Sequence, residues 1–169
     1  RRSSDLIVPP EAIAKKIYAV KELIFNKFRA KYALKKPPHI TLQPPAKLTD
    51  EQAEELANGL QSFAAAHHPV KVHCKGYGHF SDRVVFIDVV EQQAIKELHL
   101  NLAHYLRARG LYPKENIREE PFHAHLTVAN RDVKGGRFQK IWQHFKDENF
   151  EAEFTAGHLM LYRHDGKLW

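Results

Sequence analysis

The chain has 169 residues, a single cysteine and a formal net charge of +6. This length suffices for one compact domain that buries roughly 70% of its unfolded surface, so folding needs no disulfide or structural metal. Cys74 stands alone, which excludes an intrachain disulfide and a zinc site built on several cysteines. No apolar run reaches the ~18 residues of a membrane span, and the apolar segment near the start is too short for a secretory signal. We therefore expect a cytoplasmic, monomeric protein that does not associate with membranes.

The basic residues and the 12 histidines give the first indication of chemistry. Lysine and arginine exceed aspartate and glutamate by 26 − 20 = 6, which favours a surface that attracts nucleotides, RNA or other phosphate-bearing partners. Histidine titrates near neutral pH, so a high count raises the expectation of acid–base or metal chemistry without locating it.

Local signals in the first half predict two strands, each followed by a helix. Pro9 and Pro10 end a short apolar run and suit the turn into a helix whose apolar residues recur at helical spacing. Thr49 and Gln52 form a capping-box signal at the start of the second helix. The predicted elements are a strand at 6–8, a helix over 11–30, a strand at 39–42 and a helix over 50–66.

In the second half, apolar residues recur at every second position, as in a strand, and then at about every 3.6 positions, as in a helix. This alternation between strand and helix patterns then repeats. Gly110 suits the left-handed position that ends a helix, and Gly157 is expected to break the last extended run. The predicted elements are two strands from 70 to 90 joined near 81–82, a helix over 91–109, a polar loop over 111–120, a strand at 122–129, a helix over 136–147 and one or two strands within 150–163.

The two halves repeat one order of elements: a strand, a long helix, a strand containing His-x-Thr, a second helix and a returning strand. No Gly/Ser-rich linker separates them. We therefore expect an α+β fold of antiparallel sheets flanked by helices, with residues 1–169 forming a single domain of two pseudo-symmetric lobes.

The repeated motif is His39-Ile40-Thr41-Leu42 in the first half and His125-Leu126-Thr127-Val128 in the second. Alternate residues of a strand face the same side, so the histidine and threonine of each motif project together, about 6–7 Å apart. Two such faces meeting would place two imidazoles beside one anion-sized cleft. Phosphodiester chemistry uses this set, because one imidazole accepts a proton, the other donates one, and hydroxyls hold the non-bridging oxygens.

With these motifs the sequence resembles the 2H phosphoesterases, a family named for two His-x-Ser/Thr motifs that includes bacterial 2′-5′ RNA ligase-like proteins and cyclic phosphodiesterases. The segments "VPPE", "GYGHF", "RVVFIDV" and "LMLYRHDGKLW" are also similar to the family's pattern. The resemblance implies a duplicated fold with a central groove that carries both motifs. It also implies chemistry on 2′,3′-cyclic phosphates or 2′-5′ linkages of RNA or nucleotides, without metal, ATP or another cofactor.

Carried over to this sequence, the resemblance makes His39 and His125 the catalytic acid–base pair. Thr41 and Thr127 then bind the phosphate. The duplication leaves the two histidines equivalent, so either one is the acid or the base at this point.

Three further residues are candidates for substrate binding. Phe80 and Tyr162 lie in segments that the family uses near its groove, and aromatic rings of this kind can stack a nucleobase. Many members carry a basic residue soon after the second motif; here Asn130 comes first and Arg131 follows. Core packing is the alternative for each aromatic ring, and a solvated surface position is the alternative for Arg131.

Two other functions stay open. The groove could bind RNA ends or nucleotides without turnover. Alternatively, His39, His123 and His125 could form a three-imidazole metal site, although this would leave the threonines without a role and no carboxylate partner is evident in the motifs.

Overall fold

The computed structural model describes residues 2–164, and it has the α+β architecture that the sequence predicts. The strands are β1 (Arg2–Ile7), β2 (Ile40–Lys47), β3 (Val70–Phe80), β4 (Val84–Val90), β5 (His125–Asn130), β6 (Glu151–Ala156) and β7 (Met160–His164). The helices are α1 (Glu11–Phe28), α2 (Asp50–Ala65), α3 (Gln93–Arg109) and α4 (Gly136–Phe145), with short 3₁₀ turns η1 (Tyr32–Lys35) and η2 (Lys114–Asn116). No helix in this described part combines the length and apolar character that a membrane span requires.

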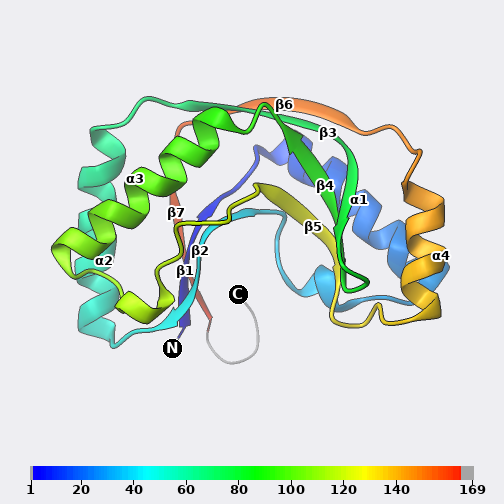
Figure 1. The fold of residues 1–169 in the computed structure, drawn as a ribbon, viewed down its shortest axis with the longest axis horizontal. Helices are drawn as coiled ribbons and strands as arrows, with labels where there is room; N and C mark the ends of the chain where they lie inside the picture. The colour runs from blue at the N-terminus through cyan, green and yellow to red at the C-terminus, as the bar shows by residue number, and fades with distance from the viewer. Residues whose placement is uncertain (1, 165–169) are drawn as a thin grey trace.

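The strands form two antiparallel sheets, one in the order β2-β1-β7 and the other in the order β5-β4-β3-β6. Figure 1 shows α2 and α3 at one end of the molecule and α1 and α4 at the other, so each end combines helices from both halves of the chain. The two strands that carry the motifs, β2 and β5, belong to different sheets and approach each other near the middle of the molecule (Figure 1).

The order of elements repeats as expected. The series β1-α1-β2-α2-β3 is followed by β4-α3-β5-α4-β6, and β7 then returns to pair with β1. Each motif strand occupies the same place in its series, since it follows the first helix and precedes the second.

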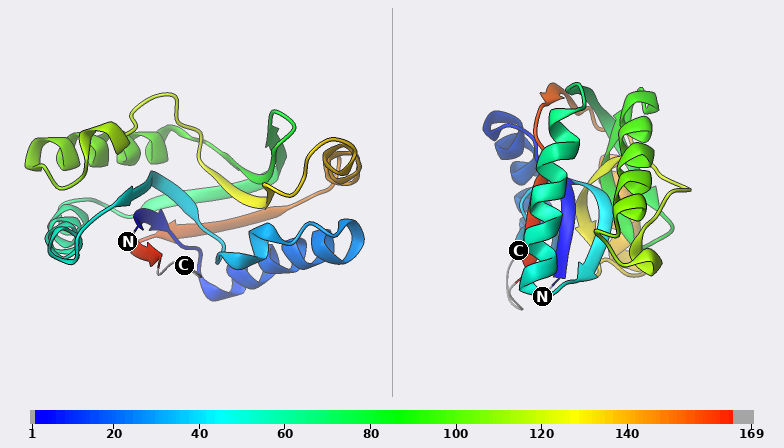
Figure 2. Two further views of the ribbon diagram at one scale, coloured as in Figure 1. Left: turned by 90° about the horizontal axis from the view of Figure 1, so that it is seen from below. Right: turned by 90° about the vertical axis from the view of Figure 1, so that its left-hand side faces the viewer.

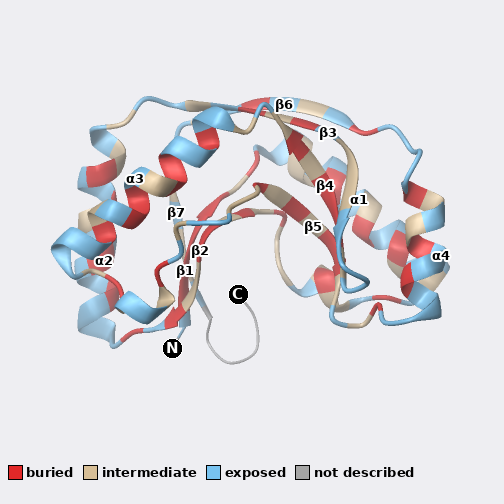
Figure 3. Ribbon diagram, viewed as in Figure 1, coloured by how far each residue is buried: buried red, intermediate tan, exposed pale blue. Residues whose placement is uncertain are grey.

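Each helix buries one face against the sheets. The capping box predicted for α2 is present, because the Thr49 side chain accepts from the Gln52 backbone and the Gln52 side chain accepts from the Thr49 backbone. Gly110 ends α3 in the left-handed conformation, at φ 61°. The helices lie outside the strands (Figure 2), with their buried positions turned inward (Figure 3), and the buried side chains form one continuous apolar core.

Three strand boundaries differ from the predicted ones by more than two residues. β1 begins at Arg2 rather than at residue 6, because it is paired along both edges, to β2 and to β7. β2 continues through Pro44 and Pro45 to Lys47; β2 is an edge strand, where a residue without an N–H is tolerated. β5 begins at His125 rather than at residue 122.

The central strand β1 carries a buried acid. Asp5 is 0% exposed, and neither of its carboxyl oxygens has a hydrogen-bond partner among the described residues. Burial raises the pKa of Asp5 to about 7, because an ionised carboxylate cannot be solvated there. Asp5 is therefore protonated in the folded protein over most of the acidic range.

We expect Asp5→Asn to change the pH dependence of stability. The wild-type carboxyl keeps its proton up to about pH 7 when folded but releases it near pH 4 when unfolded, so the free energy of unfolding falls as pH rises between these values. Asparagine does not ionise, so between pH 5 and pH 8 the wild type should lose about 3 kcal/mol more than the variant. Urea unfolding at both pH values measures this. Equal losses in the two proteins would contradict the buried, unpartnered carboxyl.

Candidate active site

The two motifs bury their apolar residues and leave the histidine and threonine half-buried. Ile40 and Leu126 are both fully buried in the core, at 0% exposure. His39 lies immediately before β2, and His125 is the first residue of β5. The alternation of the strand therefore directs both imidazoles to the side opposite the core contacts of Ile40 and Leu126.

Both histidines make the same backbone contact. Nδ1 of His39 lies 2.7 Å from the carbonyl oxygen of Pro37, and Nδ1 of His125 lies 2.7 Å from the carbonyl oxygen of His123. A carbonyl oxygen can only accept a hydrogen bond, so Nδ1 carries the proton in each ring. Nε2 of the neutral ring is then an acceptor, which can take a proton from a nucleophile, and Nε2 of the charged ring is a donor.

The histidines lie beside two cavities that share Thr41. The smaller one, of about 60 Å³, is lined by His39, Thr41 and Tyr162 together with Ser4 and Leu6 of β1. The larger one, of about 470 Å³, is lined by Thr41 from one side and by His125 from the other. Its remaining wall includes Phe80, His99, Asn116, Arg118, Phe122 and His123.

His39 is surrounded by positive charge. Burial lowers the pKa of His39 to about 4; the hydrogen bond to Pro37 opposes this, and the charges of Lys21, Lys36 and His125 lower the pKa further. His39 is thus neutral at physiological pH, with Nε2 able to accept a proton.

The surroundings of His125 contain a carboxylate instead. Burial lowers the pKa of His125; the hydrogen bond to the His123 carbonyl opposes this, a charge on His123 lowers the pKa and the charge of Asp88 raises it. Asp88 lies opposite His125 in the β4–β5 register, and its Oδ1 is 2.6 Å from Nε2 of His123. Asp88 therefore favours the charged form of His125, whereas no acid among residues 2–164 is a cause of the His39 shift.

Aromatic rings hold His125 on the side of the β3–β4 hairpin. The ring of Phe80 meets His125 edge to face at 4.8 Å between centroids, and the ring of Phe86 lies at 5.2 Å. Gly78 makes this arrangement possible, because a Cβ there would come within 2.6 Å of the Phe86 ring. Phe80 is still 39% exposed, so one part of its ring is free to meet a ligand.

The far wall of the larger cavity rests on contacts that join α3, β2 and the loop before β5. The rings of His99 and Phe122 stack at 3.9 Å with an interplanar angle of 2°. The buried Gln43 side chain binds Arg118 twice, since its Nε2 donates to the carbonyl at 3.0 Å and its Oε1 accepts from the amide at 2.9 Å. Phe122 was weighed from the sequence as a ring that could stack a nucleobase, whereas Gln43, His99 and Arg118 were assigned no function.

A buried lysine supports the segment that leads to His39. Lys21 of α1 is 2% exposed, and its Nζ donates to the carbonyl oxygens of Ala33 at 3.1 Å and Lys36 at 2.9 Å. Lys36 directly precedes Pro37, whose carbonyl accepts from His39. Lys21 thus combines a structural contact with a positive charge near the imidazole.

Two of the predicted site residues lie outside both cavity walls. Thr127 is half-buried on the same strand face as His125, opposite Phe86 in the sheet. Arg131 directly follows β5, and its guanidinium lies 4.8 Å from the ring centroid of Tyr32. Burial lowers the pKa of Lys36, and the charge of nearby Arg131 lowers that pKa further.

The proposed three-imidazole metal site has no geometric counterpart. Within residues 2–164, no group of three or more histidine, cysteine, aspartate or glutamate side chains is arranged to hold a metal ion. Nε2 of His123 is instead occupied by Asp88.

Comparison with known proteins identifies a matching family and several related bacterial proteins. A profile of the 2′-5′ RNA ligase superfamily matches residues 9–168. A Geobacillus kaustophilus protein, named as a candidate phosphoesterase, is 27% identical over 148 residues, covering 85% of this chain and 80% of that protein. A similarly named Bacillus cereus protein is 30% identical over 142 residues, covering 79% and 74%.

Two solved structures share the fold. A Thermus thermophilus protein matches with a TM-score of 0.71 at 20% identity, covering 96% of this chain and 88% of that chain. E. coli LigT complexed with 3′-AMP matches with a TM-score of 0.61 at 17% identity, covering 96% and 87%.

We expect Lys21→Met to raise the pKa of His39, because the substitution removes a positive charge that disfavours the imidazolium. The pKa is measured by NMR titration of the ring Cε1–H signal, assigned by its absence from the spectrum of His39→Ala. Lys15→Met is the matched control, since Lys15 lies on the same helix with a side chain 76% exposed. An unchanged or lowered His39 pKa in Lys21→Met would contradict this electrostatic role.

Proposed function

The chain belongs to the 2′-5′ RNA ligase superfamily, and from this premise we propose that it is a phosphoesterase acting through His39 and His125. The substrates we propose are 2′,3′-cyclic phosphates, or 2′-5′ linkages, of nucleotides or RNA ends. The observation that carries the proposal is the matched Nδ1 contact, which leaves Nε2 as the reactive nitrogen of each ring, beside two cavities that share Thr41. The 3′-AMP in the LigT structure supports a nucleotide ligand.

The charges around the two rings favour different roles. Burial, with the charges of Lys21 and Lys36, keeps His39 neutral, which suits the general base. Burial lowers the pKa of His125 as well, but Asp88 partly offsets this by favouring the charged form, which suits the general acid. His39 then takes a proton from the attacking oxygen at Nε2, and His125 gives its Nε2 proton to the leaving oxygen.

In this proposal, hydroxyls and basic side chains bind the phosphate. Thr41 lines both cavities, and its hydroxyl is assigned to donate to a non-bridging oxygen as negative charge builds. Thr127 is assigned the same role beside His125. Lys36 on the small cavity and Arg131 near it add positive potential for an anion.

We expect His39→Ala and His125→Ala each to lower kcat by about 10²- to 10⁴-fold, the contribution of one general acid or base. The assay uses 2′,3′-cyclic nucleotides, ADP-ribose cyclic phosphate and 2′-5′ oligoadenylate, with and without EDTA. His104→Ala is the control, because its side chain is 60% exposed on α3, and it should keep wild-type activity.

Each of three outcomes would contradict one part of the proposal. Full activity in either motif variant would remove that histidine from the mechanism. Loss of wild-type activity in EDTA would favour a metal-dependent hydrolase. Tight nucleotide binding without product from any of these compounds would favour a binding module that uses the same groove.

The pH profile should be displaced to the acid side of neutrality. The free enzyme needs His125 charged and His39 neutral, and both pKa values lie below the usual 6.5, that of His39 at about 4. We therefore expect kcat/KM to rise through an acid limb near pH 4 and to fall already as pH increases from 6 to 8. Initial rates at subsaturating substrate measure this. A kcat/KM that increases between pH 6 and pH 8 would contradict the assignment of acid and base.

A further inference from the structure

The cavities beside the two histidines differ greatly in size, and this difference bears on which molecule attacks the phosphorus. We infer that the cavity beside His39 admits water but not a second nucleoside as the attacking group, so the site hydrolyses rather than joins nucleotides. The cavity beside His125 then holds the nucleoside that carries the phosphate. This inference rests on the proposed function and specifies the direction of its reaction.

The volumes support this division. The small cavity measures about 60 Å³, which holds a few waters or a small alcohol, because one water needs roughly 10–15 Å³ on this measure. The large cavity measures about 470 Å³, within the range of roughly 300–1,000 Å³ that is usual for small-molecule sites. Only the latter can contain a base and ribose.

One wall of the small cavity belongs to the central strand of a sheet, which limits how far the cavity can widen on that side. Ser4 and Leu6 are 3% and 4% exposed on β1, which is hydrogen-bonded to a strand on each side. Thr41 is the register partner of Leu6, and Pro37 and Pro45 add stiff backbone. The part of the wall formed by Ser4, Leu6 and Thr41 can therefore move apart only if β1 separates from β2.

The large cavity has the surface that a nucleoside needs. Phe80 and Phe122 offer ring surface for stacking a base, and Asn116 and Arg118 offer hydrogen-bonding groups for its edge. His125 lies on the same wall, beside the oxygen that would leave.

The reaction balances with these groups. The oxygen of a water in the small cavity bonds to phosphorus as its proton passes to Nε2 of His39. The bond from phosphorus to one ribose oxygen breaks, and that oxygen takes the Nε2 proton of His125. The cyclic phosphate becomes a monoester on the same nucleoside, and exchange with solvent restores the two protonation states.

Competition between water and alcohols of increasing size tests this selectivity. The full chain is incubated with a 2′,3′-cyclic nucleotide in water containing methanol, 1-propanol or uridine, and the phosphate monoester and diester products are separated by chromatography. We expect the wild type to form monoester and methyl ester but no dinucleoside product from uridine. Transfer to uridine with a molar efficiency equal to that of methanol would overturn the inference.

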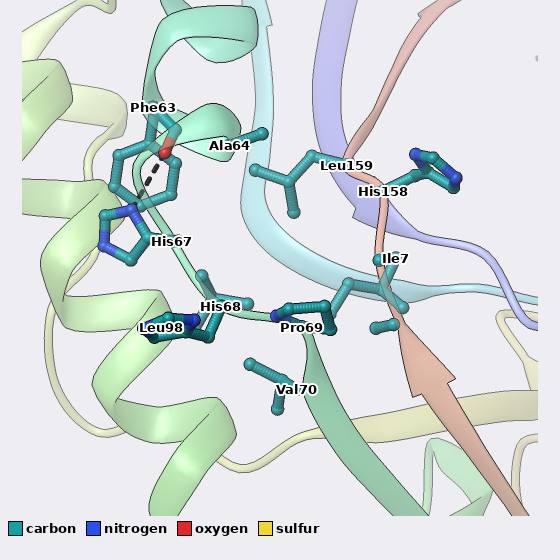
Figure 4. A pocket seen from close by; sticks show the side chains of 12 residues that line it. Ile7, Phe63, Ala64, His67, His68, Pro69, Val70, Leu98, His158 and Leu159 are labelled. Carbon is teal, nitrogen blue, oxygen red and sulfur yellow. Dashed lines mark hydrogen bonds between the residues drawn. The ribbon is translucent and has the colours of Figure 1, made fainter.

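Leu6→Ala enlarges the small cavity and should raise the ratio of propyl to methyl ester by roughly tenfold. This is the lower end of the change in selectivity that one methylene group causes in a packed pocket. Ile7→Ala is the matched control. Ile7 is the next residue on β1 but lines a separate pocket of about 30 Å³ with Phe63 and Leu98 (Figure 4), so its loss costs similar core packing while leaving the ratio at the wild-type value.

Ser4→Val changes the cavity in the opposite direction, and it keeps the test valid if Leu6→Ala does not fold. Added methyl groups should lower the ratio of methyl ester to monoester several-fold. Ratios equal to those of the wild type in the folded variants would overturn the inference while leaving phosphoesterase activity intact. Absence of all products in the wild type would instead overturn the proposed function, and this inference with it.

Discussion

The proposed chemistry depends on the position of one proton on each motif imidazole. Nδ1 donates to a backbone carbonyl two residues earlier in both motifs, at 2.7 Å. Because that carbonyl belongs to the same short segment as the ring, the contact sets the tautomer and the ring orientation together. Pro37 strengthens this in the first motif, since its fixed φ limits how far the accepting carbonyl can turn. A ring flipped by half a turn would present the wrong nitrogen to the substrate.

The elements that the sequence predicts well are those whose signals are local. The capping box before α2, Gly110 after α3 and the break at Gly157 each depend on residues within one turn of the chain, and each is confirmed. The early start of β1 and the passage of β2 through two prolines depend on pairing with strands far away in sequence. Such pairing leaves no local signal, so those boundaries were misplaced.

The residues of the candidate site also divide into those with a local sequence signal and those that depend on contacts between distant segments. The repeated His-x-Thr pattern can be read directly, and the structure places His39 and His125 at cavities that share Thr41. Lys21 gives a partial signal, because it is a charged residue within the apolar stripe of α1, but the two carbonyls it binds are visible only after folding. The contact of Asp88 with His123 depends on the β4–β5 register and has no signature in the sequence.

Duplication would make the two imidazoles equal, whereas a phosphodiester reaction needs them to differ. The motifs themselves keep their symmetry, down to the same hydrogen bond at the same distance. The difference comes from neighbours that the repeat does not share: a buried cation, Lys21, on the side of His39, and a carboxylate, Asp88, on the side of His125. The cavity volumes differ in the same sense, with the small one on the side of the proposed base. Charge and space therefore support one direction of reaction, in which water enters beside His39 and the nucleoside oxygen leaves beside His125.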